Sequence, residues 1–463
     1  MKLALLIANR GFFPSSVIES ARADMRAAAE KCGVTLLEPD EGMTRYGAVE
    51  TTQEGARYAA FLNDHRGQYD GLIVCLPNFG DENGIKAAIR DAGVPMLLQA
   101  YPDEIGKMDF ANRRDAFCGK LALASVLKQM DYPYTSGMPF VMHPRSPEFE
   151  KELTDFISVC RIVSRMRKLR LGCFGARTTA FKSVRFDEIA LERHGVDVET
   201  IDLSALFHRI RQIDDADPAV AAWLDKLAAS MRMDDAPAYA KLALGKLGAA
   251  LDQTICEMGL DAFAIRCWGE LQDELKIAAC SVLGVFNQLG VPAACESDVT
   301  NAVAMMALHL ASDAPVGCLD LNNNYGSEAD KCILFHCGPL PLDLMEGAGN
   351  IEEHKMFVKT QGDNCSWGLN VGRIRPGKIT ISGVRTEGGE VQFYVEEAEV
   401  TDDAVESAFF GTSGVMYLKD LQRKLMRMAE AGFRHHTIIT AGWHARAMDE
   451  ALSKYLGYRR IEL

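Results

Sequence analysis

The sequence lacks the features that mark several common classes of protein. No apolar run in its 463 residues approaches the ~20 apolar residues that a membrane helix needs, and the early apolar run at residues 3–8 is too short for the core of a signal peptide. No CxxC pair occurs among its 13 cysteines, which excludes a cysteine-based zinc site and is typical of a reduced compartment. We therefore expect a cytoplasmic protein that does not span a membrane.

A basic stripe is also missing. The chain has 50 Lys and Arg against 64 Asp and Glu, which gives a formal net charge of −14 and a pI near 5.3. This charge argues against a nucleic acid or an anionic membrane as the main partner. What remains is ordinary globular composition, with 48% hydrophobic and 25% charged residues, in a chain long enough for several domains.

Residues 1–162 alternate apolar strands with helical patterns. Strands are predicted at residues 2–8, 34–37, 71–76 and 94–99. This βαβ rhythm indicates a Rossmann-like domain with a doubly wound parallel sheet.

A second α/β domain is predicted over residues 163–345, with strands at 168–174, 198–201, 261–267, 291–295 and 332–337 and helices that include 274–289 and 300–311. The pattern changes after that point. Residues 378–384 and 390–397 alternate apolar and polar side chains around Glu387-Gly388-Gly389, which indicates a β-hairpin. The predicted fold class is α/β, with two Rossmann-like domains followed by a smaller β-rich domain over residues 346–463.

Acidic residues follow two of the predicted strands. Glu270 comes after the strand at 261–267, and Glu296 and Asp298 come after the strand at 291–295. Ligands of parallel α/β sheets bind at the carboxyl ends of strands, and hard divalent ions such as Mg²⁺ or Mn²⁺ prefer carboxylate oxygens. The alternative is that Glu270 and Asp298 only cap the helices that follow them.

Histidines add to this pattern. His435 and His436 are adjacent before a predicted strand, so they cannot both face one way, and at most one is a direct ligand. Imidazole beside carboxylates is a common site for Mn²⁺ or another transition ion. His336 ends an apolar strand. Its side chain is either packed and hydrogen-bonded in the core or contacts the substrate.

Further candidates could contact a substrate. Arg10 follows the first strand, where a doubly wound domain keeps its binding loops, and Arg177 and Lys182 could contact an anion although residues 172–185 have neither a GxGxxG nor a Walker pattern. Trp268 and Trp367 are core residues or an aromatic wall against a sugar.

Together, the segments NRGFFP (9–14), CWGE (267–270), CESD (295–298), LFHCG (334–338) and GFRHHT (432–437) make the chain similar to the L-fucose isomerase/L-arabinose isomerase superfamily over essentially its whole length. The resemblance implies two Rossmann-like domains followed by a β-rich domain. It also implies a Mn²⁺-type ion, held by two acids of the second domain and a histidine of the third.

Carried over to this sequence, the resemblance implies that Glu270 and Asp298 are both acidic ligands and catalytic carboxylates, and that His436 is the imidazole ligand. Glu274 is the rival of Glu270, and His435 is the rival of His436. Co²⁺ or Mg²⁺ could replace Mn²⁺. The resemblance further implies a homo-oligomer, a trimer or hexamer, in which the first domain of a neighbouring subunit completes the site and brings Arg10 to the substrate.

The implied reaction interconverts an aldose and its 2-ketose. A divalent ion that chelates both reacting oxygens stabilises the enediolate, and carboxylates remove and return the proton. The sugar is L-fucose-like or arabinose-like, or it is sulfoquinovose, converted to 6-deoxy-6-sulfofructose, as in a short branch of the superfamily. The substrate-binding candidates are Arg10, Arg177, Lys182, His336, Trp367 and His435. The alternatives are a cytoplasmic sugar-binding or sensing protein without catalysis and a metal-dependent sugar lyase.

Overall fold

The structure is a computed structural model that describes residues 1–406 and 409–463. Its chain forms two compact units. The first comprises Met1–Ser164 and Glu450–Tyr455, and the second comprises Arg165–Asp449 and Leu456–Leu463. The boundary that we predict at residue 162 lies close to the end of the first unit, and the boundary predicted at residue 345 lies inside the second. No helix among the described residues is both long and apolar enough to cross a membrane.

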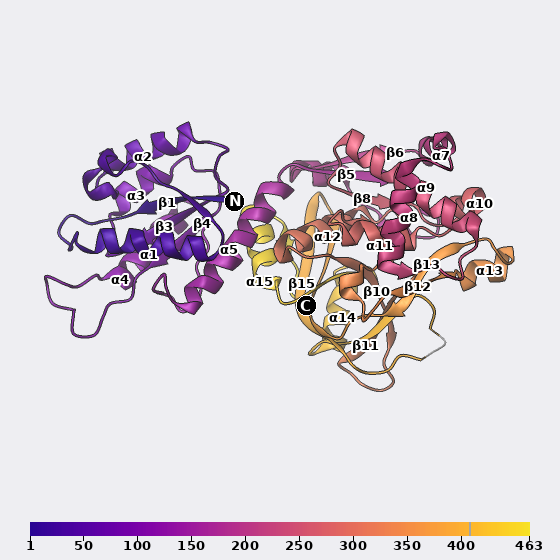
Figure 1. Ribbon diagram of the computed structural model, residues 1–463. Coiled ribbons are helices and arrows are strands. Elements are labelled where there is room, and N and C mark those ends of the chain that lie inside the picture. The colour runs from indigo at the N-terminus through magenta and orange to yellow at the C-terminus, as the bar shows by residue number, and fades with distance from the viewer. Residues whose placement is uncertain (407–408) are drawn as a thin grey trace. The chain divides into compact units, whose positions relative to one another are not determined.

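The first unit is a four-stranded parallel sheet in the order β2-β1-β3-β4, with helices on both faces (Figure 1). Its elements are β1 (Lys2–Ile7), α1 (Val17–Lys31), β2 (Thr35–Leu37), α2 (Thr52–Asp64), β3 (Gly71–Leu76), α3 (Glu82–Ile89), β4 (Met96–Ala100), α4 (Ala116–Gln129) and α5 (Pro147–Met166). The apolar strands β3 and β4 are buried along their whole length, as expected for strands covered on both faces. All four strands predicted here are confirmed.

The second unit begins with another parallel sheet, in the order β6-β5-β8-β9. Its elements up to the site are β5 (Leu169–Phe174), α6 (Glu188–Arg193), β6 (Val196–Ile201), α7 (Leu203–Gln212), α8 (Pro218–Ser230), β7 (Met231–Arg232), α9 (Ala238–Met258), β8 (Ala262–Ile265), α10 (Glu270–Leu275), α11 (Cys280–Gln288), β9 (Ala293–Ala294) and α12 (Val299–Ser312).

One predicted helix differs from the structure. The single helix expected at 274–289 is divided into α10 and α11, because Lys276 adopts a left-handed φ of 58°. The intervening chain pairs with the start of a distant strand, where the Ala278 N–H donates to the Trp367 carbonyl at 2.9 Å. A tertiary backbone pairing thus overrides the helical pattern of the sequence.

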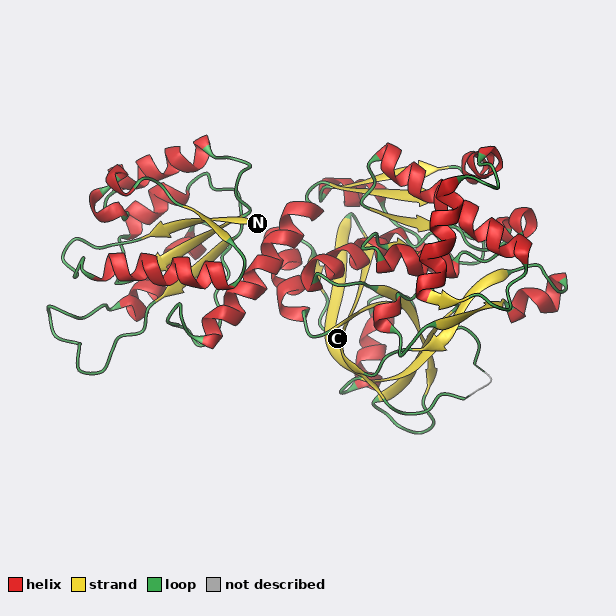
Figure 2. Cartoon of the chain, viewed as in Figure 1, coloured by secondary structure: helices red, strands yellow, loops and turns green. Residues whose placement is uncertain are grey.

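The rest of the second unit builds a ten-stranded, mostly antiparallel sheet in the order β18-β15-β14-β17-β10-β11-β16-β13-β12-β7. Its elements are β10 (Gly317–Asn324), β11 (Lys331–His336), β12 (Gly349–Glu353), α13 (Lys355–Gln361), β13 (Trp367–Arg373), β14 (Gly377–Glu387), β15 (Glu390–Thr401), β16 (Thr412–Tyr417), α14 (Leu421–Glu430), β17 (His436–Ala441), α15 (Ala445–Asp449) and β18 (Arg459–Arg460). Figure 2 shows these long strands beside the helices of the same unit. The α/β fold class, with a β-rich C-terminal part, is confirmed.

Helix α12 links the two sheets of the second unit. It contacts β8 and β9 of the parallel sheet and β14 and β17 of the mixed sheet, and nearly every one of its side chains is buried. The turn that leads from β9 into this helix therefore lies where the two sheets meet. That turn holds Glu296 and Asp298.

Candidate metal centre

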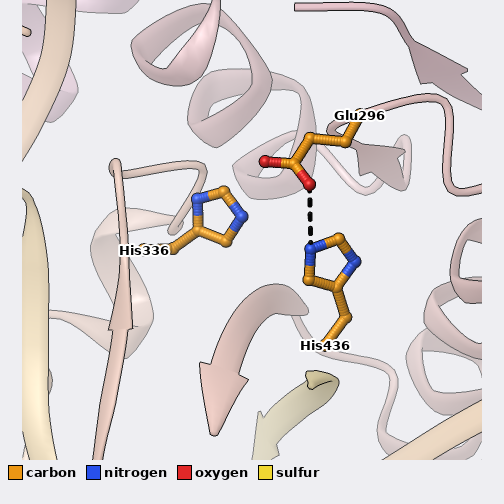
Figure 3. Close-up of side chains that lie close together, drawn as sticks. All are labelled: Glu296, His336 and His436. Atoms are coloured by element: carbon orange, nitrogen blue, oxygen red, sulfur yellow. Dashed lines mark ion pairs between the residues drawn. The ribbon is translucent and has the colours of Figure 1, made fainter. Parts of the chain in front are cut away.

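Three segments far apart in the sequence bring polar side chains together in the second unit. Glu296 follows β9, His336 ends β11 and His436 begins β17. Figure 3 shows the Glu296 carboxylate directed at the His436 ring, with the His336 ring facing the same space. One ligand atom from each of these three residues lies within 4.8 Å of the others, which is close enough for all three to hold one metal ion.

The register of the mixed sheet explains part of this meeting. Asp320 on β10 pairs directly with His436 on β17, and its other neighbour is Phe335 on β11, the residue before His336. Asp320 Oδ1 consequently lies 3.6 Å from His436 Nε2 and 4.0 Å from His336 Nε2. Asp320 also forms a second candidate group with His435 and His436, which shares His436 Nε2 with the first.

Several buried polar atoms at this point have no hydrogen-bond partner. They are Glu296 Oε2, Asp320 Oδ1 and His436 Nε2, although His436 Nε2 lies within ion-pair distance of Glu296 Oε2 at 3.2 Å. Buried polar groups are normally satisfied. Two carboxylate oxygens and an imidazole nitrogen that converge without partners form the mixed donor set that a divalent transition ion prefers.

Two consecutive residues of the turn that carries Glu296 have a strained backbone. Glu296 and Ser297 both adopt left-handed conformations, with φ values of 62° and 57°. Such conformations cost free energy for residues that carry a Cβ, and they cluster at functional sites. The turn aims the carboxylate of Glu296 at the cavity while the Ser297 N–H still donates to the Ile265 carbonyl of β8 at 3.0 Å.

The charges of the site depend on its burial and its neighbours. Burial alone would raise the pKa of Glu296, but the His436 imidazole beside it lowers the pKa. Burial likewise opposes the charged form of His436, yet the surrounding anionic groups, Asp298 and Glu296 among them, hold its pKa well above the usual range. For His336, the Asp320 carboxylate outweighs burial and raises the pKa to about 10.

Asp298 lies just behind the site and is fully buried. Its Oδ2 accepts a hydrogen bond from His436 Nδ1 at 2.7 Å, and both of its oxygens are bound by Arg434. Asp298 also caps α12 by accepting from the Asn301 N–H at 3.2 Å. Burial raises the pKa of this carboxyl, but Arg434 and His436 prevail and hold it well below its usual range.

A cavity of about 490 Å³ opens in front of these groups. One side is an aromatic wall, in which Phe181 and Trp268 make an edge-to-face contact at 5.4 Å between ring centroids. Carboxylate, amide and imidazole groups line the cavity as well. Residues 1–406 and 409–463 contribute no Lys or Arg to the lining, which consists of Phe181, Trp268, Glu296, Asp320, Asn322, Phe335, His336, Cys337, Met356, Glu406, Phe409, Phe410 and His435.

The structure gathers a different set of acids from the pair that the sequence predicts as ligands. Glu270 opens α10, where its Oε2 is ion-paired with Arg266 Nε at 2.5 Å, and Glu274 is exposed and lies 3.9 Å from Arg211. Neither lines the cavity, although Trp268, two residues before Glu270, does. Gly269, not Glu270, occupies the cap position of α10.

The predicted substrate-binding residues have varied positions. His336 and His435 line the cavity. Arg177 donates to the carbonyls of Thr178, Thr179 and Phe181 within its own loop, and Lys182 is exposed in a short helical turn. Trp367 begins β13 outside the cavity lining, and its Nε1–H donates to Asn364 at 3.4 Å.

Arg10 belongs to the first unit. Its guanidinium stacks over the Phe79 ring at 4.0 Å and lies 3.6 Å from Glu82. It lines a smaller cavity of about 240 Å³ with Phe12, Phe13, Phe79, Phe110, Arg113 and Asp115.

Asp320 and Glu406 were not identified from the sequence. The apolar–polar alternation Cys318-Leu319-Asp320-Leu321-Asn322 is a signal for a strand that carries Asp320 on one face. Nothing local in the sequence indicates that this strand pairs with the one that carries His436, because strand order in the mixed sheet is set by contacts distant in sequence.

The chain is similar in sequence to sugar isomerases. Residues 4–167 match the family model described as the N-terminal domain of fucose/sulfoquinovose isomerase. A sulfoquinovose isomerase from Alkalicoccus urumqiensis is 25% identical over 388 residues, which cover 81% of this chain and 82% of the relative. A sulfoquinovose isomerase from Priestia megaterium (strain ATCC 12872 / QMB1551) is 22% identical over 420 residues, which cover 88% and 87%.

Among solved structures, a periplasmic solute-binding protein of an ABC transporter from Actinobacillus succinogenes 130z, with bound D-allose, is 11% identical to this chain. The match covers 68% of this chain and 92% of that protein with a TM-score of 0.17, a value at which no shared fold is inferred.

Proposed function

We propose that the chain is a member of the fucose/sulfoquinovose isomerase family and that it interconverts an aldose and its 2-ketose with a divalent ion held by Glu296, His336 and His436. The observation that carries this proposal is that each of these three residues brings a ligand atom within 4.8 Å of the others, while the buried Glu296 Oε2 and His436 Nε2 have no hydrogen-bond partner. The donor set of carboxylate and imidazole fits Mn²⁺, with Co²⁺ and Mg²⁺ as alternatives.

The ion, when bound, would polarise the two oxygens of the sugar between which the carbonyl moves. The protein's own groups supply the rest. Phe181 and Trp268 would pack against the apolar face of the sugar, and Asn322 and Glu406, which also line the cavity, would hydrogen-bond hydroxyl groups.

The proton that passes between C1 and C2 needs a carboxylate at the cavity. We assign this role to Asp320, because its Oδ1 faces the site without a hydrogen-bond partner. The family resemblance instead predicts Glu270 and Asp298 for this step, and Glu270 lies two residues after Trp268 in the chain. The two assignments separate in the variants Asp320→Asn and Glu270→Gln, since loss of the proton carrier lowers kcat by orders of magnitude while sugar binding persists.

Sulfoquinovose is the first substrate to test, because it is the sugar named for the curated relatives. Its anionic sulfonate needs a cation, and the described residues that line the cavity supply none. The proposal therefore includes a cation from outside this lining. Arg10 of a neighbouring subunit is the residue predicted to supply this cation. L-fucose-like and arabinose-like sugars are the alternative substrates, and they need no such cation.

The experiment is an aldose panel of sulfoquinovose, L-fucose and L-arabinose, incubated with metal-stripped protein and with Mn²⁺-reconstituted protein and followed by ¹³C NMR. We expect the 2-ketose of at least one sugar to form, and only in the reconstituted sample. Sugar binding without turnover in both samples would instead identify a sensing protein, and fragments from carbon–carbon cleavage would identify a lyase. Either result overturns the proposal.

A further inference from the structure

A buried ion pair stands directly behind one member of the proposed metal centre. Arg434 and Asp298 have side chains that are 4% and 0% exposed, and the guanidinium binds both carboxylate oxygens through Nε and Nη2. Arg434 is fixed in turn by the Val384 carbonyl at 3.1 Å and by the Thr300 hydroxyl. Two planar groups paired in this way have little freedom to rotate.

The pair keeps a proton on Nδ1 of His436, so that Nε2 is the nitrogen that can bind a metal ion. A carboxylate bound by a guanidinium is ionised and can only accept hydrogen bonds. The proton in the 2.7 Å contact between His436 Nδ1 and Asp298 Oδ2 therefore belongs to the imidazole. Nδ1 thus donates to Asp298. The other nitrogen, Nε2, lies 3.2 Å from Glu296 Oε2 and 3.6 Å from Asp320 Oδ1.

We propose that Asp298 and Arg434 are positioning residues that hold His436 with Nδ1 protonated, so that Nε2 is presented to a divalent ion. Asp298 orients the ring, and Arg434 neutralises Asp298 and occupies its oxygens so that this carboxylate does not itself turn toward the ion. Such groups behind a ligand fix the ring and tautomer of a histidine, and their removal typically weakens metal binding about 10–100-fold. The inference rests on the proposed function only for the presence of the ion.

The tautomer can be tested without any metal. Asp298→Ala removes the oxygen that contacts His436 Nδ1, so nothing then holds the proton on that nitrogen. We expect ¹⁵N NMR of histidine-labelled, metal-free protein, titrated upward in pH until His436 becomes neutral, to show the Nδ1–H form in the wild type and a substantial share of the Nε2–H form in Asp298→Ala. An unchanged tautomer would overturn the inference whether or not the protein binds a metal.

The variant Arg434→Gln distinguishes two roles of Asp298. One is the positioning role proposed here, and the other is the direct metal ligand that the sequence analysis predicts. If Asp298 positions His436, loss of Arg434 leaves the carboxylate misplaced, and the Kd for Mn²⁺ rises about 10–100-fold. If Asp298 is a ligand, the same variant removes its competitor, and the Kd for Mn²⁺ stays equal or falls. Arg434→Lys, which keeps the charge but loses the bidentate contact, should lie between the wild type and Arg434→Gln.

A loss of stability alone could also weaken metal binding, so a matched control is needed. Lys424 and Glu396 form another largely buried ion pair of the same unit, with side chains 13% and 16% exposed. Lys424→Met should lower the melting temperature but leave the Mn²⁺ Kd and the His436 tautomer as in the wild type. If Lys424→Met raises the Kd as much as Arg434→Gln does, the effect is general destabilisation and the positioning role is refuted. Absence of Mn²⁺ binding by the wild type would instead refute the proposed function.

Discussion

His336 of the candidate metal centre has a raised pKa in the metal-free protein. It is buried at the end of β11, and although burial by itself lowers the pKa of an imidazole, the nearby Asp320 carboxylate raises the pKa of His336 to about 10. Its unfolded value is about 6.5. The charged imidazole therefore stabilises the metal-free fold fully below pH ~6.5, and this contribution is lost as the pH rises toward 10.

A metal ion must displace this proton, so its binding is predicted to be pH-dependent. Histidine ligands coordinate in their deprotonated form. We expect the Mn²⁺ affinity to rise with pH between 6.5 and 8.5, about tenfold per pH unit for each proton released. Isothermal titration calorimetry in buffers of different ionisation enthalpy counts those protons. A Kd that is independent of pH, with no proton released, would remove both histidines from the ligand set.

Glu296 and Glu406 offer a matched pair of substitutions. Both line the same cavity, but only Glu296 belongs to the candidate metal groups. Glu296→Gln should weaken Mn²⁺ binding at least 100-fold and lower turnover by several orders of magnitude, because it replaces a charged ligand with a neutral one. Glu406→Gln should keep the Mn²⁺ Kd of the wild type. Equal losses in the two variants would place the ion elsewhere in the cavity.

At the scale of elements, the turn between β9 and α12 decides the geometry of the site. Ser297 adopts φ 57°, its hydroxyl is buried without a partner, and glycine adopts this conformation without a steric penalty. We predict that Ser297→Gly raises the free energy of unfolding by about 0.5–1 kcal/mol. Urea denaturation measures the change. Ser297→Ala removes the hydroxyl but keeps the Cβ, so a gain as large in Ser297→Ala would assign the effect to the hydroxyl and contradict the role of backbone strain.

Elements with strong local patterns could be predicted from the sequence, and those defined by distant partners could not. The fully apolar strand β3 and the hairpin of β14 and β15 were predicted closely, because burial on both faces and a Gly-Gly turn leave local signals. The helix divided at Lys276 was not, since its break is stabilised by a pairing with Trp367. The same limit applies to the site. The segment 295–298 was identified as chemically important, but whether Glu296 or Asp298 faces the cavity depends on two left-handed residues and on Arg434, 136 residues away.

At the scale of the whole molecule, the first unit carries several large apolar side chains that are exposed. Phe12, Ile105 and Phe110 are 70%, 98% and 82% exposed, and Phe12 and Phe110 line the small cavity that also contains Arg10. Exposed apolar groups around a cavity commonly mark a surface that contacts another molecule. They support the prediction of a homo-oligomer in which a neighbouring first domain brings Arg10 to the substrate.

Subunit mixing tests this prediction. Arg10→Ala and Glu296→Gln subunits are each expected to be nearly inactive on sulfoquinovose, and co-refolded mixtures should regain up to about one quarter of the wild-type activity per site, because in a mixed oligomer some sites combine an intact Arg10 with an intact Glu296. Mixtures of Glu270→Gln with Arg10→Ala serve as a second pair. Subunits that exchange, as shown by native mass spectrometry, but regain no activity would place Arg10 in the site of its own chain or outside catalysis.

A divalent ion bound between Glu296, His336 and His436 of the second unit is the basis of the proposed reaction. Crystals of the Mn²⁺-loaded protein, measured above and below the manganese absorption edge, locate the ion directly. We expect one anomalous peak about 2.0–2.3 Å from Glu296 Oε2, from a ring nitrogen of His336 and from His436 Nε2, with Asp298 still bound to Arg434. A peak coordinated by Glu270 and Asp298 instead, or no peak at full Mn²⁺ loading, would rule out this metal centre.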